Sequence, residues 1–251
     1  VIARFAEMIM FLLFIMYRRQ PFLVGLSRFW HIDFRLFGRI IRKSSLILYS
    51  ECIWAISETV SAAFLNTRGG ADVVSGMNAG LTISHLFFIC FAGTTVSTGV
   101  VIGQELGAGR LERARQYKNW MLFGILVLGL AFMLFGFGSV CLIPLVFGRL
   151  SAAARHIAFC LVLVTATYMP LWAYINGQYA ISRAGGDVKM GAVCDTISNI
   201  LFIGSIIILS FTTPLGPVAL YAIVKLSDIV NMLVAQFWLR RERWVVNLTK
   251  Q

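Results

Sequence analysis

Six long apolar stretches follow one another along this chain, and they constrain its fold more than any other feature. They lie at residues 46–65, 78–102, 120–147, 157–182, 190–211 and 216–239. A helix needs roughly 20 apolar residues to cross a bilayer, and each stretch reaches that length. Only helices and closed β-barrels satisfy their backbone inside hydrocarbon, and these runs are too continuous for alternating barrel strands. The sequence therefore predicts an all-α, polytopic membrane protein with about six complete transmembrane helices.

The remaining segments divide the 251-residue chain into four parts. The first apolar run begins without a Met, and we expect it to be the truncated end of a membrane helix whose beginning is missing. The next segment mixes basic and aromatic residues, which is typical of a helix on the inner membrane surface, although a solvated linker is an alternative. Its lipid-facing side chains would be Phe34, Phe37, Ile40 and Ile41. The predicted parts are a truncated transmembrane helix at 1–17, a cytoplasmic interfacial linker at 18–43, a six-helix lobe at 44–243 and a cytoplasmic tail at 244–251.

The basic residues indicate how the chain crosses the membrane. Lys and Arg number 22 against 11 Asp and Glu, a net charge of +11 that could also suggest a nucleic-acid partner. Seventeen of the 22 lie in one set of alternate loops and at the C-terminal end, and only three lie in the opposite loops. Such an alternation follows the positive-inside rule. We therefore predict a multi-pass protein of the cytoplasmic membrane with its C-terminus in the cytoplasm, and no nucleic-acid partner.

Two acidic residues stand inside the first of the six stretches. Glu51 and Glu58 are seven residues apart, so a helix brings both onto one face, close to Trp54. Ionisable groups are costly in hydrocarbon and mark ion or proton pathways there. Because no basic residue shares this stretch, we interpret Glu58 and Glu51 as candidates for coupling transport to Na⁺ or H⁺. The alternative is a neutral acid that hydrogen-bonds a neighbouring helix.

Polar and aromatic side chains share faces in two further stretches. Asn78 and His85 are seven residues apart in the second stretch. Trp172 and Asn176 are four apart in the fourth stretch, next to a bend expected at Pro170. A cavity for amphipathic organic molecules combines such groups, although helix packing also uses them. The candidates for a substrate cavity are therefore Trp54, Asn78, His85, Trp172 and Asn176.

Two other groups inside the stretches favour structural roles. Lys225 and Asp228 are three residues apart in the last stretch and are expected to pair on one helix face. Asp195 begins a polar face near the Gly-rich segment 183–189. We expect it to contact that loop rather than a substrate.

The sequence lacks the motifs of several enzyme classes. It has no phosphate-binding GxxxxGK[ST] loop, no GxSxG nucleophile elbow and no zinc-binding HExxH pair. Its five cysteines have no CxxC spacing, which argues against a metal site or a disulfide framework. We therefore predict a protein that is not an enzyme and holds neither a cofactor nor a structural metal.

Three segments point to a family. Residues 103–115, GQELGAGRLERAR, resemble the G-x-x-L-G-A-G-x-x-x-x-A-[RK] loop of the multidrug and toxic compound extrusion (MATE) family. Residues 182–189, SRAGGDVK, resemble its L-R-A-x-G-D-[TV]-[RK] loop. Residues 243–249, RWVVNLT, are similar to the tail of many bacterial members. The three together are specific to this family.

The resemblance implies the C-terminal lobe of a MATE transporter, from the end of the sixth helix to the twelfth, with an N-terminal lobe of the same protein as its partner. It implies an antiporter of the bacterial inner membrane that exports amphipathic or cationic organic compounds in exchange for Na⁺ or H⁺ by alternating access. Its other partners would be these small organic substrates and membrane lipid.

One departure from the family concerns the coupling ion. Some members carry cation-binding acids in the seventh and tenth helices, whereas this sequence has Trp172 where the second acid would fall. Two alternatives to multidrug export are a flippase of lipid-linked saccharides from the same superfamily and a membrane scaffold or receptor-like protein.

Overall fold

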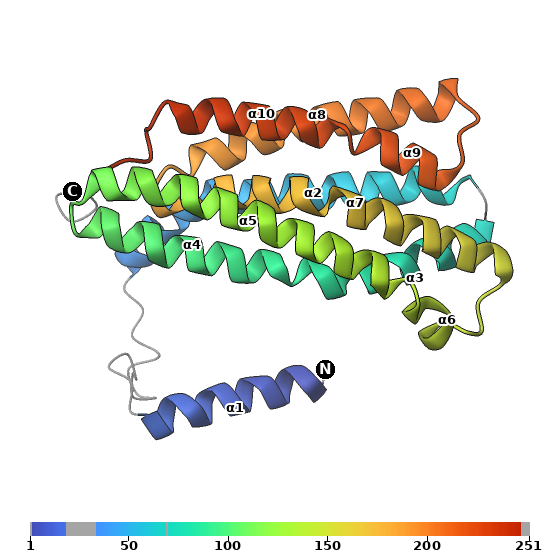
Figure 1. Ribbon diagram of the computed structural model, residues 1–251, viewed down its shortest axis with the longest axis horizontal. Helices are drawn as coiled ribbons and strands as arrows, with labels where there is room; N and C mark the ends of the chain where they lie inside the picture. Colours follow the sequence, from blue (N-terminus) through green and yellow to red (C-terminus); the bar gives the residue numbers. More distant parts are fainter. Residues whose placement is uncertain (1, 19–33, 69, 247–251) are drawn as a thin grey trace. The chain divides into compact units, whose positions relative to one another are not determined.

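A computed structural model describes residues 2–18, 34–68 and 70–246, which are almost entirely helical (Figure 1). The chain forms two compact units, residues Val1–Ser45 and Leu46–Gln251. The first unit contains α1 (Ile2–Arg18) and the first turns of α2 (Phe34–Asn66). Of the interfacial segment predicted at 18–43, residues 19–33 lie outside the described residues, and the rest from Phe34 is the start of α2. Residues 247–251 of the predicted tail also lie outside them.

The second unit contains the rest of α2 and the other helices of the described chain. They are α3 (Gly70–Phe88), α4 (Cys90–Gly107), α5 (Leu111–Ser139), α6 (Leu142–Val146), α7 (Ala152–Ala184), α8 (Lys189–Thr212), α9 (Pro217–Val224) and α10 (Ser227–Arg240).

The helices confirm the predicted class of fold. Five helical segments within the described residues are long and apolar enough to cross a membrane, namely Gly70–Gly107, Leu111–Ser139, Ala152–Ala184, Lys189–Thr212 and Pro217–Arg240. The chain is therefore an all-α, multi-pass membrane protein. The stretch predicted at 46–65 lies within α2, which is not among the five, because two glutamates and several serines dilute its apolar character.

Two predicted spans differ in extent from the helices that form. The stretch predicted at 78–102 belongs to a longer helical segment that begins at Gly70 and is interrupted at Ile89, between α3 and α4. The stretch predicted at 120–147 ends as α5 at Ser139, and the short α6 follows it. Hydropathy records how apolar a segment is, not where its backbone leaves helical geometry.

The last predicted span is broken near its middle, between α9 and α10. Lys225 caps the C-terminal end of α9, and α10 begins two residues later. At the break, the N–H of Leu226 donates to the carbonyl oxygen of Ile223 at 3.1 Å. This three-residue separation is the tighter 3₁₀ pattern, which marks a local change of helix geometry.

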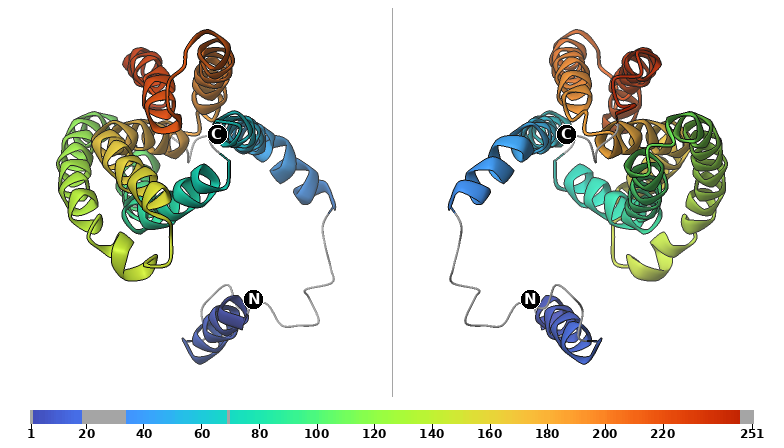
Figure 2. Two further views of the ribbon diagram at one scale, coloured as in Figure 1. Left: turned by 90° about the vertical axis from the view of Figure 1, so that its right-hand side faces the viewer. Right: turned by 90° about the vertical axis from the view of Figure 1, so that its left-hand side faces the viewer.

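The central helix of the second unit is α7, which packs against α3, α4, α5 and α10. The end-on views of Figure 2 show its gold ribbon between the green α5 and the orange and red α8 and α10. A Cβ added to Gly129 of α5 would lie 2.9 Å from Pro170 Cα, and one added to Gly136 would lie 2.7 Å from Ala166 Cβ. Membrane helices associate through such close packing of small residues, so this interface positions α7. The helix continues without interruption through Pro170.

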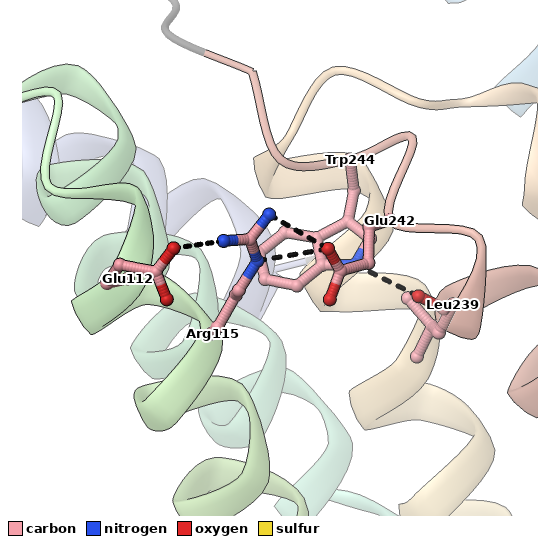
Figure 3. Close-up of polar contacts among 5 residues, drawn as sticks. All are labelled: Glu112, Arg115, Leu239, Glu242 and Trp244. Atoms are coloured by element: carbon pink, nitrogen blue, oxygen red, sulfur yellow. Dashed lines mark hydrogen bonds and ion pairs between the residues drawn. The ribbon is translucent and has the colours of Figure 1, made fainter.

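After α10 the chain turns back, and Glu242 and Trp244 contact neighbouring segments (Figure 3). Trp244 is 1% exposed, and its Nε1 donates to the carbonyl oxygen of Leu239 at 3.3 Å. Arg115, in the first turns of α5, forms an ion pair of 2.9 Å with Glu242. A Cβ built on Gly185 would overlap the carbonyl oxygen of Trp244, so only glycine fits there. We call Arg115, Gly185, Leu239, Glu242 and Trp244 the tail cluster.

Candidate functional site

A pocket of about 580 Å³ lies in the second unit, with walls from α2, α3, α4, α7, α8, α9 and α10. Sites for small organic molecules commonly have volumes of roughly 300–1,000 Å³. The larger aromatic side chains of its wall are Trp54, Phe88, Phe91, Trp172, Tyr179, Phe202 and Tyr221. Its charged lining residues are the acids Glu51, Glu58, Asp195 and Asp228 and the bases Arg183 and Lys225. The wall thus combines aromatic surface with an excess of acidic groups.

Most of the site residues predicted from the sequence meet at this pocket. Its lining includes Glu51, Glu58, Trp54, His85, Trp172 and Asn176. The seventh predicted residue, Asn78, is not brought there. It is exposed on α3, about one helical turn before Leu81, which does line the pocket. Their seven-residue spacing places Asn78 and His85 on the same face of α3. It does not show how far along that face the pocket extends.

An ion pair joins two walls of the pocket. The Nζ atom of Lys225 lies 3.0 Å from Oε1 of Glu58 in α2. The prediction that Lys225 pairs with Asp228 is therefore wrong. Three-residue spacing brings two side chains together only on a continuous helix, whereas the break after α9 lies between these two residues.

Asp228 faces the pocket from the first turn of α10. Its carboxylate accepts a hydrogen bond from Nε1 of Trp172 at 2.8 Å and another from Oγ of Ser198 at 3.3 Å. Trp172 also stacks on Tyr168, with ring centroids 5.6 Å apart. Trp172 stands at the position where the family resemblance leads us to expect an acid. In this chain a carboxylate lies next to that position, but it belongs to Asp228 of α10.

Asp195 lies in the pocket wall on α8. It accepts a hydrogen bond from the Tyr179 hydroxyl at 2.7 Å and one from Ser50. Tyr179 also contacts Asn231, with its hydroxyl 2.9 Å from Oδ1. Asp195 makes these hydrogen bonds with α2 and α7 rather than with the Gly-rich segment 183–189, of which Arg183 interacts with it through its charge.

The last two charged residues of the pocket are less constrained. The Glu51 carboxylate makes no hydrogen bond or ion pair with any other residue that the structure describes. The guanidinium carbon of Arg183 lies 5.9 Å from the centre of the Tyr179 ring. No group of three or more His, Cys, Asp or Glu side chains suited to a metal ion occurs in the described part of the chain.

The two Gly-rich loops, residues 103–115 and 182–189, are stabilised by contacts that lie largely outside the pocket. In the first loop, Arg110 donates two hydrogen bonds to the Glu105 carboxylate, at 2.6 and 3.0 Å. The hydrogen bond to this carboxylate raises the pKa of Arg110 above its usual range. In the second loop, Asp187 accepts a hydrogen bond from Nε1 of Trp238 at 2.9 Å. These contacts are within or between neighbouring segments, as in structural connectors.

Comparison with known proteins decides the family. The MatE family model matches residues 47–207, which include most of the pocket walls. The chain belongs to the MATE family. Members of the MATE family are membrane transporters, so the chain belongs to a transporter family rather than to an enzyme family. No curated protein sequence matches the chain.

Solved MATE transporters share the fold of this chain. A MOP superfamily transporter from Pyrococcus furiosus is 20% identical, with a TM-score of 0.72, and the match covers 84% of this chain and 47% of that one. For that transporter, the reverse polarity of the binding pocket was taken to suggest a different function. The MATE transporter VcmN of Vibrio cholerae, in its bent form, is 16% identical, with a TM-score of 0.69 and coverages of 84% and 48%.

A third similar structure is a MATE transporter in complex with MaL6. It is 18% identical, with a TM-score of 0.72, and the match covers 92% of this chain and 53% of that one. At these identities the likeness concerns the fold alone. The chain spans about half the length of the solved transporters that it matches.

Proposed function

We propose that the protein is a secondary active antiporter that exports amphipathic or cationic organic compounds in exchange for Na⁺ or H⁺. In this proposal it works in the bacterial inner membrane, with its C-terminus in the cytoplasm, in accord with the distribution of Lys and Arg residues. The transport path lies between this lobe and a second lobe like the other half of the solved transporters. Alternating access then opens the pocket to one side of the membrane at a time.

One observation carries the proposal: the pocket sets carboxylates among aromatic rings. Trp54 and Trp172 line the pocket, where aromatic side chains can contact an apolar body, and an organic cation is attracted both by rings and by carboxylates. Asp195 and Asp228 take part in hydrogen bonds but in no ion pair within the described chain, so neither is already matched with a basic side chain. Small organic cations with an aromatic body suit such a wall best.

Coupling requires an acid whose charge state changes the structure. Glu58 is suited to this because its ion pair with Lys225 connects α2 to the break between α9 and α10. A proton or cation at Glu58 would weaken that link and bias the position of α2, which is the differential interaction that a coupled cycle needs. Glu51 is the other coupling candidate. It lies seven residues before Glu58 on the same helix and lines the same pocket.

The flippase alternative needs cations that can bind a pyrophosphate group. Two basic residues line the pocket, Arg183 and Lys225, against four acids. Because Lys225 is already paired with Glu58, only Arg183 would remain for an anionic ligand. Charge complementarity therefore favours a cationic substrate over a lipid-linked pyrophosphate.

Export of a fluorescent organic cation from cells tests the proposal. We expect Glu58→Gln to abolish energy-dependent efflux, because the neutral amide cannot exchange a proton or hold a cation. Glu112→Gln is the matched control: this carboxylate is also ion-paired, with Arg115, but lies at the tail cluster (Figure 3). Normal efflux by a well-expressed Glu58→Gln protein would remove Glu58 from the mechanism. Absence of efflux by the unmodified protein would leave the flippase and scaffold alternatives.

A further inference from the structure

The ammonium group of Lys225 is surrounded by one carboxylate and three aromatic rings, an environment that suits a cation. Its Nζ atom lies 3.0 Å from the Glu58 carboxylate, 4.6 Å from the ring centre of Phe202 and 5.5 Å from that of Tyr221. The Trp172 ring centre is 5.7 Å away. A carboxylate with several ring faces is how proteins recognise ammonium groups, and here the chain itself supplies the ammonium.

The surroundings of Glu58 suit this tethered ammonium better than a sodium ion. Hard cations such as Ca²⁺ and Mg²⁺ take several oxygen ligands at short range, and Na⁺ shares this preference. The Lys225 side chain is 12% exposed and the Glu58 side chain 34% exposed, so the pair is mostly removed from water. Next to this carboxylate the structure provides an ammonium group, and aromatic rings surround that ammonium.

Covalent attachment also favours Lys225 in the competition with Na⁺. A group held on the same chain competes as an intramolecular ligand, which a dissolved ion at ordinary concentration matches poorly. A sodium ion at Glu58 would, in addition, stand close to a second positive charge and be repelled by it. Sodium binding at Glu58 therefore requires the ion pair to open first.

We propose that Lys225 is a tethered counter-cation that excludes Na⁺ from Glu58 and so determines the ion selectivity of this carboxylate. The exclusion of Na⁺ from Glu58 concerns ion binding alone. Its consequence, that exchange at Glu58 proceeds without Na⁺, rests on the proposed transport function. Removing the ammonium turns Glu58 into a site that Na⁺ can occupy.

A cycle of four purified proteins tests this inference: the unmodified protein, Glu58→Gln, Lys225→Met and the double variant. Each is titrated with Na⁺ at constant ionic strength, with N-methylglucamine as the replacement cation, while tryptophan fluorescence is recorded. Trp54 and Trp172 line the pocket and act as reporters. The quantity of interest is the part of the Na⁺ response that disappears when Glu58 is replaced by Gln.

We expect no Glu58-dependent response in the protein with Lys225, and a saturable one in Lys225→Met. Lys225→Arg, which keeps a cation, is expected to resemble the unmodified protein. A Glu58-dependent Na⁺ response in the unmodified protein would overturn the inference, as would its absence from a folded Lys225→Met protein. If Lys225→Met does not fold, Lys225→Gln replaces it. If neither folds, the comparison of the unmodified protein with Glu58→Gln decides.

The binding measurement does not depend on transport. If the cycle gives the expected pattern but the unmodified protein exports no organic cation, the proposed function fails and the counter-cation role of Lys225 stands. If export occurs and the unmodified protein binds Na⁺ at Glu58, the proposed function stands and the counter-cation role fails.

Discussion

The pocket and the tail cluster use the same side-chain chemistry for different ends. In the pocket Trp172 donates to Asp228 at 2.8 Å, and next to the tail cluster Trp238 donates to Asp187 at 2.9 Å. Around the first pair a cavity of about 580 Å³ remains, whereas the tail cluster buries Trp244 completely against neighbouring backbone. The Trp172–Asp228 pair therefore borders a cavity that a ligand can enter, whereas the Trp238–Asp187 pair joins α10 to a loop beside a closed packing site.

Removing a tryptophan from each region should give the largest difference in stability. Trp244→Ala is expected to lower the free energy of unfolding by about 3–5 kcal/mol, because it opens a large cavity in a closed packing site. Trp172→Ala should cost less than half of that, because the half-buried Trp172 already borders the pocket. Thermal and denaturant unfolding in detergent measures both. Equal losses would show that the pocket is packed as tightly as the tail cluster.

Replacing each of the two aspartates that accept a hydrogen bond from a tryptophan should show which of them contributes to ligand binding. Asp228→Asn keeps the acceptor for Trp172 but removes a charge from the pocket, so we expect affinity for an organic cation to fall about tenfold, or about 1.4 kcal/mol. Asp187→Asn makes the same chemical change beside Trp238 and should leave that affinity unchanged. Calorimetric titration with a tetraphenylphosphonium salt measures the difference. An equal effect of both substitutions would argue against a ligand role for Asp228.

The smallest effect is expected from the exposed ion pair of the tail cluster. The side chains of Arg115 and Glu242 are 37% and 40% exposed, so solvent screens their attraction. Glu242→Gln should therefore lower the free energy of unfolding by about 0.5 kcal/mol or less, and added salt should shrink the difference further. Unfolding curves at low and high salt provide the check. A loss comparable to that of Trp244→Ala would mean that charge, not burial, holds the tail.

The sequence predicts the helical membrane fold well, because the apolar stretches record burial in lipid directly. It also predicts the face of α2 that carries Glu51, Trp54 and Glu58, since seven-residue spacing holds on any regular helix. Asn78 shows the limit of this reasoning: the periodicity of α3 gives its face, but only packing against α7 determines how far the pocket extends.

The partners of the charged residues could not be predicted in the same way. Glu58 and Lys225 are 167 residues apart, and their contact depends on how α2 lies against the broken last span. Local spacing instead suggested Lys225 with Asp228, which the break makes unsuitable. One signal was present: the first stretch carries two acids and no basic residue, and the last stretch carries the single lysine found within the six stretches. Opposite charges in two different membrane stretches are candidates for a contact between the stretches.

The most direct test of the account is to locate a bound substrate. A photoactivatable aromatic ammonium compound would be irradiated with the purified protein, and labelled peptides identified by mass spectrometry. We predict adducts on the α2, α7 and α10 segments that carry Trp54, Trp172 and Asn231, reduced when Asp228→Asn is used. Labelling confined to lipid-facing residues elsewhere, such as Phe123 and Leu134 of α5, would contradict a substrate role for the pocket.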